Sequence, residues 1–130
     1  MARQARQPSD VQRQFDRGGL RLPDTRPAGV SERAWTVLVR HIRDRVPYTA
    51  LAAEMRITGH TVRQLADQAV EALRYPDLAD LPGVIRQALV RGGYTTREAI
   101  TRASDVDLLS VKRMSPARLR EVRRVLPQAR

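Results

Sequence analysis

The chain has 130 residues, enough for one domain or for two very small helical modules but not for a large enzyme core. It contains no cysteine, so disulfide bonds, thiolate zinc sites and cysteine nucleophiles are excluded. Its 24 basic residues against 14 acidic ones give a formal net charge of +10, which favours a polyanionic partner such as nucleic acid.

The first 30 residues are predicted to form a basic, flexible arm. Proline and glycine recur throughout this segment and would interrupt any helix of useful length. Val11, Phe15 and Leu20 leave a second reading open, in which a short stretch of the arm docks on the folded part. The segment has no apolar core of a secretory signal, and no run in the chain approaches the roughly 18 apolar residues of a membrane span. We therefore expect a cytoplasmic, nucleoid-associated protein with no membrane partner.

Three helices are predicted over residues 31–76. Ser31 is expected to cap the first, which has apolar residues at helical spacing and ends at Pro47. A short helix follows. Thr58 is expected to cap a third, longer helix, which Pro76 closes.

Residues 77–130 are predicted to contain further, shorter helices. Thr95 and Glu98 stand three apart, as in a capping box, and Ser115 before Pro116 is typical of the start of a helix. No stretch has the period-two alternation of a β-strand. The predicted fold class is therefore all-α, with a domain over residues 31–76 and a second over residues 77–130.

Residues 48–76 are predicted to form a helix-turn-helix. In this motif the front of the second helix enters the major groove of DNA while its apolar face stays packed. Arginine and glutamine have the donor and acceptor geometry for guanine and adenine edges, and both occur at the expected front. A solvated helix face is the alternative reading. The predicted DNA-contacting residues are Thr58, Gly59, His60, Thr61, Arg63 and Gln64.

Residues 58–65 read Thr-Gly-His-Thr-Val-Arg-Gln-Leu, and residues 73–76 read Leu-Arg-Tyr-Pro. This pattern resembles the recognition helix of sigma factor region 4, and the resemblance extends over about residues 31–76. It implies a DNA-binding fold of the bacterial transcription machinery. Of the residues that this family uses on DNA, Arg63 and Gln64 carry over.

Residues 89–100 and 107–122 resemble the C-terminal domain of the bacterial RNA polymerase alpha subunit. The shared pattern includes a Gly-containing turn after a first helix, a Leu-Leu pair, a hairpin and a final helix. The resemblance implies a helix-hairpin-helix, in which hairpins and helix N-termini offer backbone N–H groups to phosphates. Arg113, Ser115 and Arg118 are the candidate phosphate contacts of this module, which binds either DNA or protein.

Several positions depart from both families. Where sigma factors carry an Arg and a Glu that read the promoter, this chain has Gly59 and His60, and Arg56 replaces the usual turn glycine. The minor-groove arginine of the alpha domain corresponds to a position near Val84, and its hairpin glycine corresponds to Ser115. Recognition of the standard promoter hexamer is therefore not expected.

Basic residues are densest near the C-terminus. A solvated helix face and contact with nucleic acid are both open readings of this cluster. The preference for arginine fits guanidinium groups that grip phosphate, and equally a GC-rich genome. The predicted C-terminal basic face consists of Lys112, Arg113, Arg118, Arg120, Arg123 and Arg124.

Catalytic and metal-binding patterns are not found in the sequence. His41 has no second ligand at metal-binding spacing, so we expect it to have a structural or surface role. Paired aspartates occur only where helix starts explain them, and no glycine-rich phosphate loop follows a strand. No enzyme activity, cofactor or metal is therefore expected, although helix-hairpin-helix modules also occur in nucleases and ligases.

The sequence favours a DNA-binding transcription regulator that acts on double-stranded DNA through the helix-turn-helix, with basic surfaces on phosphate. The alternative is a factor that binds RNA polymerase or another transcription factor through its sigma-like or alpha-like module. The combination of two polymerase-like modules in one chain motivates this alternative. Neither reading specifies the oligomeric state.

Overall fold

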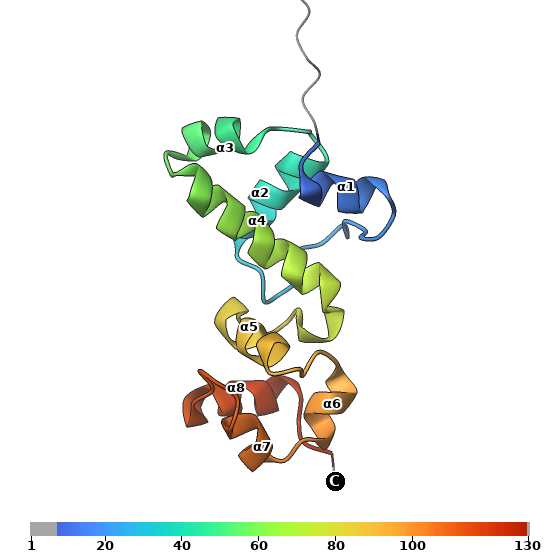
Figure 1. Ribbon diagram of the computed structural model, residues 1–130, viewed down its shortest axis with the longest axis vertical. Coiled ribbons are helices and arrows are strands. Elements are labelled where there is room, and N and C mark those ends of the chain that lie inside the picture. The colour runs from blue at the N-terminus through green and yellow to red at the C-terminus, as the bar shows by residue number, and fades with distance from the viewer. Residues whose placement is uncertain (1–7, 130) are drawn as a thin grey trace, which may run out of the picture.

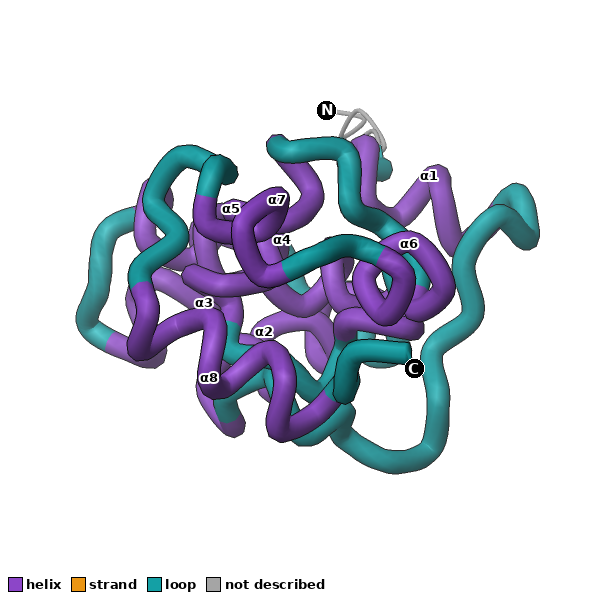
Figure 2. The backbone as a smooth tube through the Cα atoms, turned by 90° about the horizontal axis from the view of Figure 1, so that it is seen from below, coloured by secondary structure: helices purple, strands orange, loops and turns teal. Residues whose placement is uncertain are grey.

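The computed structural model of the protein describes residues 8–129 and is all-α in that range, as predicted (Figure 1). A view turned by 90° likewise shows helices and loops but no strand in the described residues (Figure 2). The α-helices are α1 (Asp10–Asp16), α2 (Glu32–Ile42), α3 (Tyr48–Met55), α4 (Gly59–Arg74), α5 (Gly83–Arg91), α6 (Arg97–Arg102), α7 (Asp105–Leu109) and α8 (Pro116–Val125), with a 3-10 turn η1 (Pro76–Leu78) between α4 and α5.

The helices form two groups along the long axis of the molecule (Figure 1). The N-terminal group consists of α1–α4, and the C-terminal group consists of α5–α8. Helix α4 is the longest, with 16 residues, and it runs from the N-terminal group towards α5. The chain passes from one group to the other once, through η1.

Side-chain caps explain where most of the helices begin. The hydroxyls of Ser31, Thr58 and Ser115 each accept a hydrogen bond from the backbone N–H three residues later, as predicted. The predicted capping box at Thr95 is wrong by one residue, because Thr96 is the N-cap of α6. Helix boundaries are therefore set largely by local chemistry.

Two apolar clusters hold the N-terminal group together around α2 and α4. One cluster joins α2, α3 and α4 through the fully buried Val37, Leu51 and Val62. The other joins α1, α2 and α4, with Leu38 and Ala69 at its centre. Helix α4 contributes to both clusters, so its apolar faces are covered and its polar face is left to solvent.

The segment expected to be a flexible arm packs against the fold over residues 8–30. Ser9 and Gln12 form a capping box that starts α1, and Val11 is buried against the N-terminal group. Phe15 and Leu20 also pack on that cluster, so the docking reading describes this stretch. The rest of the predicted arm, residues 1–7, lies outside the described residues.

The C-terminal group has one core of its own. Every helix from α5 to α8 contributes to it, together with the segment around η1. This core is separate from the two N-terminal clusters, so the two groups are packed units joined at a seam. Its buried residues are Leu78, Leu81, Ile85, Leu89, Ile100, Ala103, Leu108, Leu119, Val122 and Leu126.

A buried arginine lies at the seam between the two groups. Arg86 of α5 is only 1% exposed. Its Nε donates to Oε1 of Glu71 (3.1 Å), and its Nη2 donates to the carbonyl of Gln68 (3.0 Å), both on α4. Its Nη1 donates to the carbonyl of Leu81 (3.0 Å) and reaches that of Gly29 (3.4 Å). One side chain therefore ties α5 to α4 and to the loop before α2.

Candidate nucleic-acid interface

The turn between α3 and α4 is tight and is built around Arg56. This residue is the C-cap of α3 and adopts a left-handed conformation, with φ 57° and ψ 45°. A non-glycine residue in this region costs roughly 1–2 kcal/mol, so the buried apolar residues on both sides must hold the turn in place. Ile57 packs on the α2–α3–α4 cluster directly after it. The Arg56 side chain itself is exposed.

The front of α4, residues 58–64, is presented to solvent by this turn. Gly59, His60, Arg63 and Gln64 are exposed. Val62 is fully buried on the opposite side of the helix. The structure therefore brings these four predicted DNA-contacting residues together on one free helix end.

The two threonines of the front of α4 are engaged with each other. The Thr58 hydroxyl accepts from the backbone N–H of Thr61 at 3.1 Å, and the two hydroxyl oxygens lie 2.9 Å apart. Their first role is to fix the start of the helix. Gly59, which lies between them in the sequence, borders open space, since a Cβ there would find no atom within 4 Å.

An acidic residue shares the exposed stripe of the front of α4. Asp67 lies one turn beyond Arg63, and both line a hollow of about 370 Å³ that also includes Ser9 and Asp10 at the start of α1. The carboxylates lower the positive potential beside Arg63. The exposed stripe therefore carries mixed charge, with Arg63 nearer the start of the helix and Asp67 one turn further on.

The predicted phosphate contacts of the C-terminal group are largely used within the chain. The Ser115 hydroxyl accepts from the backbone N–H of Arg118 (3.2 Å) and so caps α8. The Arg118 guanidinium donates through Nη1 to the carbonyl of Arg113 (2.6 Å), which braces the turn before α8. Arg113 adopts φ 70° and is exposed. Of the three residues, Arg113 has the side chain that is most available to a ligand.

The predicted C-terminal basic face is smaller than expected. Arg123 does not belong to it, because its guanidinium is 15% exposed and donates to Asp105 Oδ1 (2.9 Å) and to the carbonyls of Ile100 and Ala103. Arg124 pairs with Glu121. Arg123 therefore joins α8 to α6 and α7, whereas Arg124 pairs within α8, and charge alone does not reveal either role.

No family model matches this chain, and no curated protein or solved structure matches it. Within residues 8–129, no three His, Cys, Asp or Glu side chains gather as a metal site would require. No helix of this range is long and apolar enough to cross a membrane.

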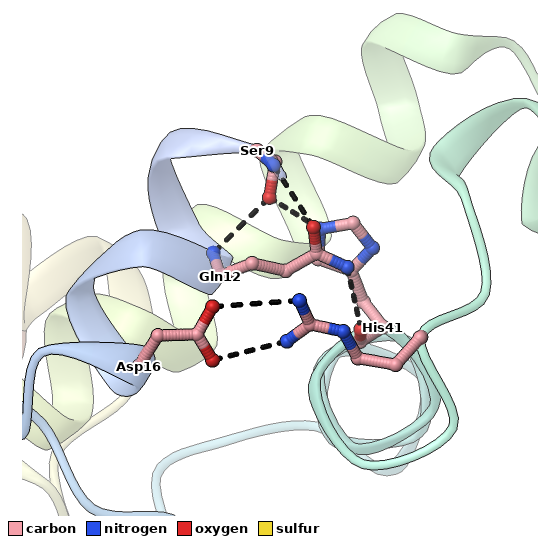
Figure 3. Close-up of polar contacts among 5 residues, drawn as sticks. Ser9, Gln12, Asp16 and His41 are labelled. Atoms are coloured by element: carbon pink, nitrogen blue, oxygen red, sulfur yellow. Dashed lines mark hydrogen bonds and ion pairs between the residues drawn. The ribbon is translucent and has the colours of Figure 1, made fainter. Parts of the chain in front are cut away.

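A polar cluster behind the candidate interface was not found by sequence reasoning (Figure 3). His41 of α2 is 3% exposed and has a structural role, one of the two that the sequence left open. Its Nδ1 lies 2.8 Å from the carbonyl of Val46, and its Nε2 lies 2.6 Å from the Ser9 hydroxyl. Because a carbonyl only accepts, Nδ1 carries a proton. Burial lowers the pKa of His41, which favours the neutral ring, and in that form the Ser9 hydroxyl donates to Nε2. The ring thereby joins α1 to α2.

The same cluster reaches α3 and the end of α1. The His41 ring stacks on Tyr48, the first residue of α3, with 3.9 Å between ring centroids. Burial raises the pKa of the Tyr48 hydroxyl to about 12. Asp16 of α1 pairs with Arg45, Oδ1 to Nη1 at 3.1 Å (Figure 3). Besides the apolar residues of this stretch, the capping pattern Ser9–Gln12 is a local sequence signal for the start of α1.

Acidification is expected to destabilise the fold through His41. Burial lowers the pKa of His41 below its ordinary value of 6.5, against the opposing effect of the Val46 carbonyl. The unfolded chain then binds more protons than the folded one, so the contribution is present above pH 6.5 and is lost as the pH falls below it. Urea unfolding between pH 7.5 and 5.5 should show a decreasing free energy of unfolding. His41→Gln should flatten this slope, whereas His60→Gln, on the exposed front of α4, should keep it.

Proposed function

We propose that the protein binds double-stranded DNA as a bacterial transcription regulator, with α3 and α4 forming a sigma-like helix-turn-helix. The observation that carries the proposal is the exposure of Arg63 and Gln64 on the front of α4, opposite the buried Val62 and directly after a tight turn. A helix that presents its first turns in this way fits the major groove. The proposal places the protein on the nucleoid.

The chemistry of the front of α4 suits base edges and phosphate together. The Arg63 guanidinium can donate two hydrogen bonds to O6 and N7 of guanine, and the Gln64 amide can pair with N6 and N7 of adenine. Gly59 has no side chain to hold the helix away from the DNA. The N-terminal N–H groups of α4 and the two threonine hydroxyls are suited to a phosphate. The net charge of +10 supplies salt-dependent attraction.

The test is selection of duplexes from a randomised DNA pool by the full chain, followed by fluorescence anisotropy on a selected duplex. The double substitution Arg63→Ala and Gln64→Ala should weaken binding about 100-fold, since each bidentate base contact is worth roughly 1–3 kcal/mol. Asp67→Asn should instead tighten binding a few-fold at low salt, because it removes a negative charge from the same stripe. Both variants keep the buried face of α4 intact.

The matched control is Arg33→Ala, which removes an exposed arginine from α2, away from the front of α4. Its effect on the affinity for the duplex should be no larger than the small decrease expected from removing one screened positive charge. Binding that is equally strong in the double variant and in wild type would exclude the front of α4 from the DNA contact.

A further inference from the structure

A groove crosses the surface of the C-terminal group between α5 and the loop that joins α7 to α8. Its volume is about 270 Å³. Apolar, basic and polar residues line it. We call the apolar lining residues Val84, Ala88 and Val111 the floor and the basic lining residues Arg91, Lys112 and Arg113 the rim; Gln87 and Gly92 complete the lining.

The floor of the groove is an apolar surface left open to solvent. Val84 is 55% exposed, which makes it one of three large apolar side chains exposed in the described part of the chain. Gly92 allows Val111 to approach closely, because a Cβ at residue 92 would lie 3.0 Å from both Val111 methyl groups. The exposed Val84 and the closely packed Val111 therefore offer an apolar surface to an apolar group.

The rim carries positive charge that the chain does not neutralise. Arg91, Lys112 and Arg113 are exposed, and none of the ion pairs found in residues 8–129 involves them. No acidic side chain lines the groove in that range. Other arginines of the same group do have acidic partners, as Arg102 has Glu98. The groove therefore combines an apolar floor with unneutralised positive charge.

We propose that this groove is a docking site for an acidic segment of a partner protein. An apolar anchor side chain of the segment packs on Val84 and Val111, and its flanking carboxylates pair with the rim. Pockets for drug-sized molecules run from about 300 to 1,000 Å³, so this smaller groove suits a single anchor side chain. Charge complementarity around an apolar centre is the usual arrangement of a protein interface.

The floor favours a protein over nucleic acid. A phosphate needs hydrogen-bond donors, which the rim and Gln87 supply but the valine and alanine side chains of the floor do not, so a nucleic acid would leave the floor uncovered. In the neighbouring turn, the Ser115 hydroxyl and the Arg118 guanidinium are already bonded within the chain. The groove is also distinct from the front of α4. An experiment can therefore contradict peptide binding in the groove without contradicting DNA binding by α4, and the reverse.

The test begins with selection of random linear peptides displayed on phage against the full chain. Enriched peptides should carry an apolar residue flanked by Asp or Glu. A fluorescein-labelled synthetic copy of one such peptide should lose at least about tenfold in affinity for Val84→Glu and for Lys112→Glu, because a charge then faces the anchor or repels the flanks.

Matched controls are available on the same group of helices. Val106→Glu alters another exposed valine, on α7, and Arg120→Glu reverses an exposed arginine on α8; neither residue lines the groove. Both should bind the peptide as wild type does, as should the Arg63→Ala, Gln64→Ala double variant. Thermal melting should show all four surface variants folded.

Three outcomes would overturn the proposal. The first is a selection that enriches no acidic peptides. The second is an acidic peptide whose affinity is the same for Val84→Glu as for Val106→Glu. The third is that duplex DNA competes with the peptide for the protein, and that Val84→Glu and Lys112→Glu weaken DNA binding as much as they weaken peptide binding. That result would assign the groove to nucleic acid.

Discussion

Replacing Arg86 with alanine is expected to lower the free energy of unfolding by about 3–5 kcal/mol, the usual effect of removing one partner of a buried ion pair. The substitution leaves the Glu71 carboxylate, itself 22% exposed, without its cation. It also removes the donors to the carbonyls of Gln68 and Leu81. Each buried carbonyl that loses its donor adds a desolvation cost.

Urea unfolding at pH 7 measures this effect, with Arg102→Ala as the matched control. Arg102 also pairs with a glutamate, but its side chain is 75% exposed, so its loss should cost no more than about 0.5 kcal/mol. The double substitution Arg86→Met and Glu71→Leu should recover part of the loss, because it removes the unpaired carboxylate as well. A loss for Arg86→Ala no larger than that for Arg102→Ala would show that the seam does not depend on this side chain.

The position of Arg86 also bears on the two proposed binding sites. Its partners Gln68 and Glu71 lie on α4, whose other end carries the front of α4. The helix that bears Arg86 is α5, which lines the groove with Val84. Because the hydrogen bonds of Arg86 join the two helices, they tie the proposed DNA-contacting end to the helix that lines the groove. A partner docked in the groove would therefore be placed at a defined position relative to the DNA.

The helices with local signals were predictable, whereas the contacts between distant segments were not. Ser31 and Thr58 act through neighbours three residues away, so the sequence reveals their role. Helix α1 has seven residues, too few to show a helical period, and it depends on the distant His41. Arg86 looks like any surface arginine in the sequence, because its partners lie between 5 and 57 residues away.

In the candidate site, too, the features set by local sequence were predictable and those set by contacts between distant segments were not. The exposure of Arg63 and Gln64 was predictable from the helical period around Val62. The capping role of Ser115 was predictable too, whereas the role of Arg118 was not, since its bond to the Arg113 carbonyl depends on the conformation of the turn before α8. The groove beside Val84 could not be inferred either, because it requires α5 and the distant loop around Val111 to lie together.

A single methyl group at residue 29 is expected to disturb the seam as strongly as some core substitutions. The backbone N–H of Gly29 donates to the carbonyl of Ala79 at 2.8 Å. A Cβ here would lie 2.1 Å from the Leu81 carbonyl oxygen and 2.3 Å from that of Ala79. Both obstacles are backbone atoms, so no rotamer change relieves the clash, and the loop must move away from η1 and α5.

Gly29→Ala should therefore lower the free energy of unfolding by about 3 kcal/mol and the melting temperature by about 10 °C. Differential scanning calorimetry measures both. Gly59→Ala is the matched control: its Cβ would meet no atom within 4 Å, and alanine favours the helix that begins there. The control should melt at or slightly above the wild-type temperature. Since Arg86 reaches the Gly29 carbonyl as well, Gly29→Ala combined with Arg86→Ala should cost less than the sum of the two single losses. Strict additivity would mean that the loop before α2 and the buried arginine stabilise the seam separately.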